Sequence, residues 1–493
     1  RRQPLPLSYA QQRLWFIDQL GQGSAQYNVP GAFRLRGKFQ DICFRRAVET
    51  IIRRHEVLRT NIITVSGEAQ QLIQREFTVP VEETDLSALG VDERESAVRK
   101  LLKEDTRKAF DLSADLMLRI KVLRLSAEEH VIIYNMHHIA SDGWSKGILI
   151  REFNALYEAY SRGEANPLAP LTVQYADYAC WQREWLQGEL LENQLGYWQK
   201  QLEGIPVVHN LPLDKVRPAQ QSFAGASVFQ WLAPELTDGL RELCQRSDMT
   251  MFMLLQTAFA VLLSRYSNET DIMMGSPIAG RMHQDTENLI GFFVNTLALR
   301  IELGDNPRFE ELLGRNRHTI LEAYAHQYIP FEMLVEELRP QRSLAYSPVF
   351  QILFSLQNNE SVELQLEDLK LEAYGQDGSG LKFDLEVYAT ESESGLSVNW
   401  VYNRDLFVEE TVKRFFSSYE VLLRSIVANP QERVACLGLL TESEQHRLLV
   451  EWTATQADYS RDKCIHELFE EQVALQPDAV AVVFEDECLT YNE

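Results

Sequence analysis

Residues 136–145 (MHHIASDGWS) bring together side chains that can do chemistry. Two adjacent histidines, His137 and His138, are followed by Asp142 and Gly143. Imidazole is the side chain best suited to proton transfer near neutral pH. A glycine lets the backbone approach a substrate closely or adopt an unusual dihedral angle. The combination suggests a site for acid–base chemistry such as acyl transfer.

Two other interpretations of the histidine pair stay open at this point. Adjacent residues of a strand point to opposite faces, so only one of the two histidines can easily address a given site. A metal site needs further ligands, and the sequence contains neither an HExxH pattern nor a Cys/His cluster. Both histidines could instead be hydrogen-bonded residues of the core. The residues around the pair do not decide between these roles.

The elements that flank the pair indicate how it is held. Residues 130–138 (HVIIYNMHH) are predicted to form a buried strand, because a β-branched apolar run of strand length precedes the histidines. Residues 145–163 have apolar side chains at helical spacing, with Gly163 as the stop. The histidines are therefore expected in a strand-to-helix turn. Asp142 could orient this turn or hold an arginine, and the helix start offers unpaired backbone N–H groups.

The rest of the chain alternates helix and strand patterns, which predicts a mixed α/β fold with two lobes. A proline- and aromatic-rich stretch at 166–185 is expected to cross between them. Further helices are expected at 7–20, 44–60, 251–266 and 309–326, and further strands at 271–278, 294–303, 347–358 and 396–403. The last residues, 465–493, predict a helix followed by two short strands around Glu485–Glu487.

Composition and charge narrow the class of protein. The 493 residues include 48 Lys and Arg against 72 Asp and Glu, a net charge of −24. Such a surface repels nucleic acid and anionic membranes, so neither is expected as a partner. The six cysteines have no metal-like spacing, which is typical of buried thiols in a reducing cytoplasm. The most apolar stretch, 251–266, is interrupted by Gln256 and Thr257 and is expected to be a core helix.

The histidine segment contains the pattern HHxxxDG, and six other motifs flank it in order. They are SYAQQRLW (8–15), RHEVLRTN (54–61), YADYACW (175–181), IGFFVNTLALR (290–300), HQYIPFEMLVEEL (326–338) and RSLAYSPVFQ (342–351). Together they resemble the motifs of condensation domains from nonribosomal peptide synthetases, a family similar in fold to chloramphenicol acetyltransferase. HHxxxDG alone is shared with acyltransferases and epimerization domains, whereas the ordered set is specific. The resemblance extends to about residue 445, and Cys180 stands where the family often has another small apolar residue.

This resemblance implies a particular architecture. Two chloramphenicol acetyltransferase-like lobes, 1–178 and 179–445, are expected to form a V-shaped pseudo-dimer with a central tunnel. Residues 446–462 are expected to be a linker. Residues 463–493 resemble the start of an adenylation domain. The ATP-binding and catalytic motifs of such a domain are not present, so these residues are not expected to activate amino acids.

The resemblance also assigns roles to the catalytic candidates His138, His137, Asp142 and Gly143. His138 is implied to lie in the tunnel and to hydrogen-bond the attacking amine or the tetrahedral intermediate, with full general-base duty left open. His137 is implied to point into the fold. Asp142 is implied to form an ion pair that shapes the site, with Arg281 as its candidate partner. The N–H of Gly143 is a candidate donor to the substrate.

Three further residues are candidates for the tunnel lining. Trp144, Ser276 and Asn295 are expected either to line the tunnel or to serve as packing and scaffold residues.

The reaction implied by the resemblance, attack of an α-amino group on a thioester, needs little help from a general base. The amino group has a reference pKa near 8, and the thioester is already activated. Holding the amine and the thioester together can lower the activation barrier by roughly 7–11 kcal/mol. This effect can be larger than that of base catalysis, which accelerates a reaction by a factor of roughly 10²–10⁴.

The reaction implied is peptide-bond formation. An acyl or peptidyl thioester on an upstream peptidyl carrier protein domain would be attacked by the amine of an aminoacyl thioester on a downstream one. No cofactor or metal is expected in the chain itself, because the phosphopantetheine arms belong to the carriers and no GGxS-like carrier motif is present. The expected partners are the two carriers and the adjoining adenylation domain, in the cytoplasm.

Rival functions of the same family remain as alternatives. An epimerization domain is disfavoured by the NTLALR segment and by the adenylation-like residues that follow. A heterocyclization domain would be expected to carry an aspartate-rich motif in place of the two histidines. A non-catalytic binding or recruitment module tends to lose the second histidine, which this chain keeps as His138.

Overall fold

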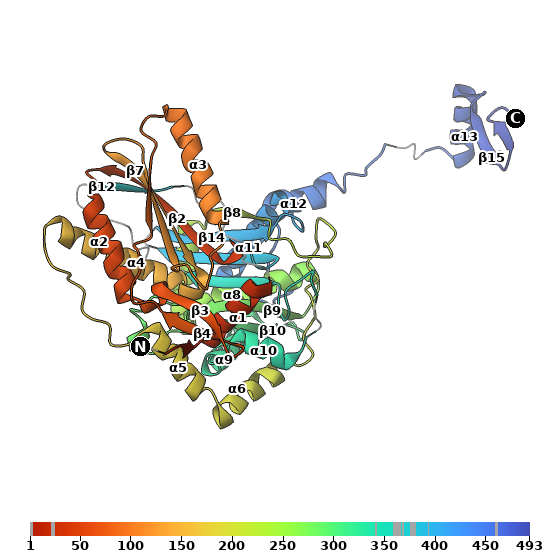
Figure 1. The fold of residues 1–493 in the computed structure, drawn as a ribbon. Coiled ribbons are helices and arrows are strands. Elements are labelled where there is room, and N and C mark those ends of the chain that lie inside the picture. The colour runs from red at the N-terminus through yellow and green to blue at the C-terminus, as the bar shows by residue number, and fades with distance from the viewer. Residues whose placement is uncertain are drawn as a thin grey trace. The chain divides into compact units, whose positions relative to one another are not determined.

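The computed structural model describes residues 3–20, 25–340, 343–357, 366, 369–374, 381–392, 394–458 and 462–493. They belong to two compact units, Arg1–Leu439 and Leu440–Glu493 (Figure 1). The first unit contains both predicted lobes, each built around its own sheet and core.

The first lobe is built on a five-stranded sheet with β7 at its centre. The strands, in spatial order, are β12 (Leu369–Ala373), β2 (Asn28–Gly37), β7 (Glu129–His137), β6 (Leu118–Arg124) and β5 (Val81–Asp85). Helices α2 (Asp41–Arg54) and α4 (Gly143–Ser161) cover one face, and α3 (Val91–Arg107) covers the other (Figure 1). Both faces are therefore buried.

The sequence of β7 shows why this strand is central. Ile132 and Tyr134 pack toward α2 and α4, whereas Val131 and Ile133 pack toward α3. A strand that is covered on both faces needs an almost continuous apolar run, as this one has. The predicted strand and helix are present as Glu129–His137 and Gly143–Ser161, and Gly163 follows the helix with φ of +77°. His138, which was expected in the strand, instead begins a short 3-10 helix at His138–Ala140.

The second lobe is built on a six-stranded sheet. Its strands, in spatial order, are β10 (Asn295–Glu302), β9 (Asp271–Ile278), β11 (Ile352–Gln357), β13 (Leu385–Ser392), β14 (Gly395–Asn403) and β8 (Gly225–Trp231). It packs with α7 (Pro234–Ser247), α8 (Met251–Ser267), α9 (Phe309–Ala325) and α11 (Glu409–Ala428). The predicted core helix is α8, in which Leu254, Leu255 and Phe259 are fully buried.

Within the described residues, no single helix is long and apolar enough to cross a membrane. Helices α7 and α8 together have the length and apolar composition of a membrane-spanning segment, but the chain bends by 108° between them.

Smaller elements complete the first unit. Strands β1 (Leu5–Pro6), β4 (Glu68–Ile73) and β3 (Thr60–Val65) form a separate sheet. The remaining helices are α1 (Tyr9–Leu20), α5 (Tyr175–Trp185), α6 (Gly188–Gln201) and α10 (Phe331–Leu338). The hydroxyl of Ser8 accepts the N–H of Gln11 at 3.1 Å, so this serine stabilises the first turn of α1.

Segments of the chain cross between the two lobes at two places. Helix α5 spans the predicted boundary at 178/179, with Tyr175 in the first core and Trp185 packed against the second. Strand β12 comes from the C-terminal half of the chain but pairs antiparallel with β2 of the first sheet. The predicted division therefore cuts through a helix, and it stays a proposal.

The second unit contains the helix and two strands expected near the C-terminus. They are α13 (Ile465–Leu475), β15 (Val480–Phe484) and β16 (Glu487–Thr490). The predicted linker 446–462 is partly helical, because α12 (Glu442–His446) continues into a π-helix at Arg447–Glu451. Residues 459–461 of that linker lie outside the described residues, as does Arg342 of the motif at 342–351.

Candidate active site

The histidine pair lies where β7 ends, and the two rings have different environments. His137 is 1% exposed and packs near the rings of Phe110 and Tyr27, with centroid distances of 5.7 and 6.4 Å. Its Nδ1 accepts the N–H of Ile139 at 3.1 Å. Burial lowers the pKa of His137 to about 3, so this ring is neutral and enclosed. A structural role for His137 stays a prediction, which this enclosed position supports.

His138 is partly exposed, and its hydrogen bonding fixes its tautomer. Nδ1 lies 2.7 Å from the carbonyl oxygen of Ser141. Because a carbonyl only accepts hydrogen bonds, Nδ1 must carry the proton, and in the neutral ring Nε2 holds the lone pair. Burial, and then the charge of Lys382, lower the pKa of His138 to about 3. The ring is therefore neutral near physiological pH, with Nε2 as an acceptor.

Phe292 packs against the His138 ring. The two centroids are 4.8 Å apart in an edge-to-face arrangement. Phe292 belongs to the segment between β9 and β10, so the second lobe supplies one wall of the histidine's environment. Its backbone carbonyl accepts a hydrogen bond from the Tyr175 hydroxyl at 2.7 Å, which holds this wall in place.

Asp142 joins the two lobes. It is the N-cap of α4, where its Oδ1 accepts the N–H of Ser145 at 2.8 Å. Its two carboxylate oxygens also lie 3.1 and 3.3 Å from Nη2 of Arg281, and Oδ2 accepts the N–H of Phe293 at 3.1 Å. The ion pair that the resemblance implied is present, and both side chains are almost fully buried.

Arg281 is held by further bonds. Its Nη1 donates to the carbonyl oxygens of Thr286 and Leu289 at 2.5 and 2.7 Å. The Ser145 hydroxyl accepts the N–H of Gly291 at 3.0 Å. The loop after the histidines is therefore fixed to residues 281–293 of the second lobe by a network of buried hydrogen bonds.

Gly143 begins α4 and has open space beside it. A Cβ added there would meet no atom within 4 Å, and the φ of Gly143 lies outside the left-handed region. The backbone therefore does not need glycine at this position. Within the described residues, the N–H of Gly143 has no hydrogen-bond partner, as is usual in the first turn of a helix. Gly143 is exposed, and its role toward a substrate stays a prediction.

The three lining candidates have different positions. Trp144 is 39% exposed, and its Nε1 donates to the carbonyl oxygen of Glu287 at 2.9 Å. Ser276 is 3% exposed within β9. The side chain of Asn295 donates to the carbonyl oxygens of Gln327 and Ile329, which gives it a scaffold role. Only Trp144 combines exposure with a position directly beside the histidine loop.

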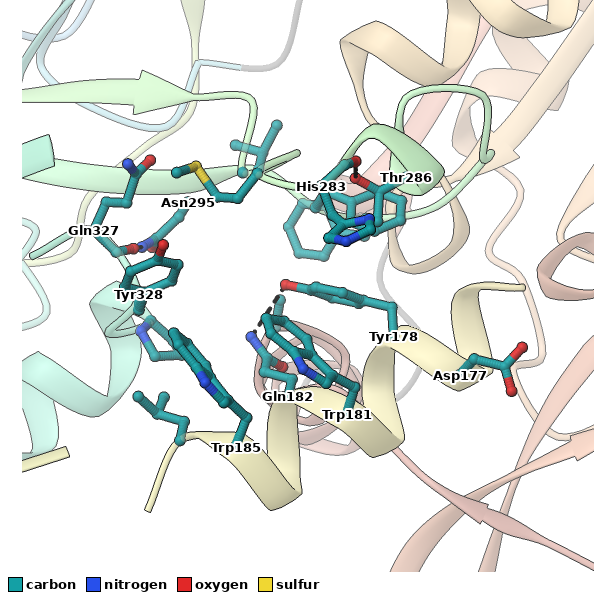
Figure 2. Close-up of a pocket in the computed structure, with 18 of the residues that line it drawn as sticks. Asp177, Tyr178, Trp181, Gln182, Trp185, His283, Thr286, Asn295, Gln327 and Tyr328 are labelled. Carbon is teal, nitrogen blue, oxygen red and sulfur yellow. Dashed lines mark hydrogen bonds between the residues drawn. The ribbon is translucent and has the colours of Figure 1, made fainter. Parts of the chain in front are cut away.

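A cavity of about 310 Å³, here called the aromatic cavity, has Phe292 among the residues that line it. Figure 2 shows Tyr178, Trp181 and Trp185 of α5 in its lining, together with Tyr328 and Asn295. The rings of Trp185 and Tyr328 pack edge to face, with their centroids 4.6 Å apart. The described residues that line it include Phe292 but not His138. Burial raises the pKa of Tyr178 to about 12, so its hydroxyl keeps its proton. Phe292 is therefore the described residue that both lines the aromatic cavity and contacts the His138 ring.

Two other histidines, the partly buried His209 and the buried His55, have both ring nitrogens engaged, whereas Nδ1 of the buried His130 has no hydrogen-bond partner among the described residues. His209 Nε2 lies 2.9 Å from Asp384, and its Nδ1 accepts the N–H of Leu211. His55 Nε2 lies 2.8 Å from Glu152, and its Nδ1 accepts the N–H of Ile290. Among the described residues, no group of three or more His, Cys, Asp or Glu side chains is arranged to hold a metal ion.

The site contains residues that sequence reasoning did not single out. Phe292 lies inside a quoted motif, but its contact with His138 depends on how the two lobes meet. Lys382 acts on His138 from 244 residues away and lies in none of the quoted motifs. No local pattern in the sequence identifies either residue as part of this site.

The chain matches one known protein family over most of its length. The sequence profile of the family described as "Condensation domain" matches residues 1–449. The chain belongs to this family, the condensation domains of nonribosomal peptide synthetases. The profile ends before residues 463–493, so the adenylation-domain start predicted there stays a prediction.

Two curated relatives are themselves synthetases. One component of the linear gramicidin synthase of Brevibacillus parabrevis is 43% identical over 498 residues, which cover 100% of this chain. Malpibaldin synthetase of Mortierella alpina is 42% identical over 494 residues, again covering 100% of this chain. The chain spans only 10% and 9% of the lengths of these relatives. The activity of either relative as a whole therefore does not transfer to this chain.

Two solved structures confirm the mixed α/β fold class. One is the X-domain from teicoplanin biosynthesis, solved in complex with OxyB, with a TM-score of 0.81 and 28% identity over 90% of this chain and 97% of the other. The second is holo-AB3403, a four-domain nonribosomal peptide synthetase, with a TM-score of 0.83 and 22% identity over 100% of this chain and 38% of the other. The V shape and the tunnel stay predictions.

Proposed function

We propose that this condensation domain forms peptide bonds between two carrier-bound thioesters. The observation that carries the proposal is the free Nε2 of a neutral His138 at the end of β7. A neutral imidazole with a fixed tautomer can accept a proton from an amine without first losing one of its own. Family membership supports the reaction class.

In the proposed reaction, the nitrogen of the acceptor aminoacyl thioester attacks the carbonyl carbon of the donor thioester. A C–N bond forms, and the carbonyl π electrons move onto oxygen. Nε2 of His138 then takes one proton from the positively charged nitrogen. The intermediate collapses, the C–S bond breaks, and the leaving sulfur receives the proton that Nε2 of His138 had taken, which returns the ring to its neutral form. The products are a peptide on the downstream carrier and a free thiol on the upstream one.

Other residues of the motif would act by holding this geometry. Asp142 and Arg281 fix the histidine loop to the second lobe, which keeps Nε2 in place during the reaction. The N–H of Gly143 would donate a hydrogen bond to the substrate. Positioning of the two thioesters would supply more of the rate than proton transfer, because proximity can contribute roughly 7–11 kcal/mol.

The proposed partners are upstream and downstream peptidyl carrier protein domains, with an adenylation domain continuing from residues 463–493. The phosphopantetheine arms of those carriers would bring both substrates. Two comparisons support the presence of neighbouring domains. The curated relatives are synthases many times longer than this chain, and a part of the four-domain synthetase has the same fold as this chain.

The test is to mix this protein with two separately loaded carriers and to follow the downstream carrier by mass spectrometry. Peptide formation that requires both carriers supports the proposal. An epimerization domain would instead exchange the α-proton of a single loaded carrier in deuterated water. Exchange of the α-proton without peptide formation would show that the domain catalyses epimerization and not condensation.

A second candidate function is recruitment of another protein without catalysis. The likeness to an X-domain solved in complex with OxyB favours it, at 28% identity. In that case this protein would bind loaded carriers or an enzyme, and no peptide would form with both carriers present. The Nε2 atom of His138, which has no hydrogen-bond partner among the described residues, would then have no function.

A further inference from the structure

Tyr175 is the first residue of α5, and its side chain is buried against residues 291–293 of the second lobe. Its ring packs edge to face with the ring of Phe293, at a centroid distance of 4.9 Å. The Tyr175 ring also lies so close to the backbone of Gly291 that a Cβ at that position would overlap it. The ring is therefore held in one place by its neighbours.

The Tyr175 hydroxyl makes two hydrogen bonds, and their directions follow from the atoms involved. Its oxygen lies 2.7 Å from the carbonyl oxygen of Phe292 and 2.8 Å from the hydroxyl oxygen of Ser8. Because a carbonyl only accepts, the single hydrogen of the Tyr175 hydroxyl points to Phe292, and Ser8 donates to Tyr175. Burial raises the pKa of Tyr175 well above its ordinary value, so the hydroxyl keeps this hydrogen.

Ser8 connects these hydrogen bonds to the start of α1. Its hydroxyl oxygen accepts the N–H of Gln11 at 3.1 Å, and its own N–H donates to Gln11 Oε1 at 3.2 Å. Gln11 Nε2 donates to the carbonyl oxygen of Ile139, the residue after His138, at 3.4 Å. Ser8 and Gln11 are both buried. The start of α1 is therefore bonded both to the histidine loop and to the Tyr175 hydroxyl.

Two contacts restrain the direction of the His138 ring. Nδ1 donates to the carbonyl oxygen of Ser141 at 2.7 Å, and the Phe292 ring packs against the imidazole at a centroid distance of 4.8 Å. The first contact holds one edge of the imidazole and the second holds its side, so together they restrain where Nε2 points. The carbonyl of Phe292 is in turn held by Tyr175. A shift of Phe292 would therefore loosen one of the two contacts.

We propose that Tyr175 is a positioning residue for the peptide-bond-forming reaction. Its hydroxyl holds the Phe292 backbone, and the Phe292 ring holds the His138 imidazole in the direction that the attacking amine requires. The inference rests on the proposed function and adds to it a residue that is buried and touches no substrate. A misplacement of about 1 Å in a reacting group can lower a rate by about 10²-fold. A hydroxyl outside the site can therefore affect catalysis.

The experiment compares wild type with Tyr175→Phe, which keeps the ring and removes both hydrogen bonds of the hydroxyl. The matched control is Tyr419→Phe, because Tyr419 is fully buried in the core of the second lobe and its hydroxyl donates to the carbonyl oxygen of Leu255 at 2.7 Å. With both carriers loaded, Tyr175→Phe is expected to lower kcat about tenfold and to leave KM unchanged. Tyr419→Phe is expected to keep the wild-type kcat.

Two further measurements test whether Tyr175 acts through Phe292. In a Phe292→Ala background, Tyr175→Phe is expected to lower kcat no further, because the ring that transmits the effect is gone. In protein isotopically labelled only at its histidines, the NMR signals of the His138 ring are identified by their loss in His138→Ala. These signals are expected to shift in Tyr175→Phe and to stay in place in Tyr419→Phe. This second measurement needs no substrate.

Any of four results would overturn the inference. The first is unshifted His138 signals in Tyr175→Phe. The second is a Tyr175→Phe protein with the wild-type kcat, or with a changed KM alone. The third is an equal fall of kcat in Tyr175→Phe and Tyr419→Phe, which would mean that the loss of any buried hydroxyl loosens the fold. The fourth is an undiminished effect of Tyr175→Phe in the Phe292→Ala background.

Failure of the proposed function looks different from failure of this inference. If wild type forms no peptide with both carriers loaded, the proposed function is wrong before any variant is made. The NMR signals of His138 then still decide whether Tyr175 positions the imidazole.

Discussion

Nη2 of Arg281 lies 3.1 and 3.3 Å from the two carboxylate oxygens of Asp142, across 139 residues of sequence. Asp142 also accepts the N–H groups of Ser145 and Phe293. A carboxylate with its oxygens occupied in this way is not available to move protons in catalysis. Its role is to fix the histidine loop of the first lobe to residues 281–293 of the second.

We therefore predict that Asp142→Asn destabilises the protein. The variant leaves the buried Arg281 charge without its counter-charge, which typically costs about 3–5 kcal/mol. Urea unfolding monitored by circular dichroism measures the change. The double variant Asp142→Asn with Arg281→Met is expected to lose less than the sum of the two single changes. An Asp142→Asn protein with wild-type stability and no activity would show that Asp142 acts directly in the chemistry.

Gly143 gives a prediction that separates folding from substrate binding. Gly143→Ala should leave the melting temperature unchanged, since its Cβ meets no atom and alanine suits a helix start. Its kcat/KM should fall by about tenfold or more, equivalent to about 1.4 kcal/mol, because the methyl group enters space that the substrate needs. Gly314→Ala, exposed on α9 with equal space, is the matched control. Full activity in Gly143→Ala would place the substrate elsewhere.

His137 gives a prediction about pH. Its pKa is about 3 in the folded protein against 6.5 for a free histidine, so below pH 6.5 the unfolded chain takes up a proton that the folded protein does not. The free energy of unfolding therefore falls as the pH drops from 6.5 toward 3, by about 1.4 kcal/mol per unit from this group. His137→Asn, whose Oδ1 can still accept the Ile139 N–H, should flatten this dependence by that amount. Equal slopes would mean that His137 is protonated in the folded state.

Local patterns predicted the strand and helix around the histidines well. The apolar run of β7 and the helical spacing of α4 each depend on residues that are neighbours in sequence. The ordered motifs then identified the family and proposed Arg281 as the partner of Asp142. Neither conclusion needed the three-dimensional fold, because both rest on short segments with specific composition.

Contacts between the lobes were not predictable in the same way. Nothing near Phe292 in the sequence shows that its ring contacts His138 from the second lobe. The pairing of β12 with the first sheet is equally non-local. Gly143 was expected to serve either close approach or an unusual dihedral angle, and the structure excludes the second, since its φ is not left-handed.

The most direct test of the account is a single-turnover comparison of wild type and His138→Ala, with both carriers loaded and saturating. The account predicts peptide formation by wild type and a fall of roughly 10²–10⁴-fold in the variant, with unchanged circular dichroism. If His138→Ala forms the peptide at the wild-type rate, the free Nε2 of His138 is not part of the reaction, and the proposed mechanism is wrong.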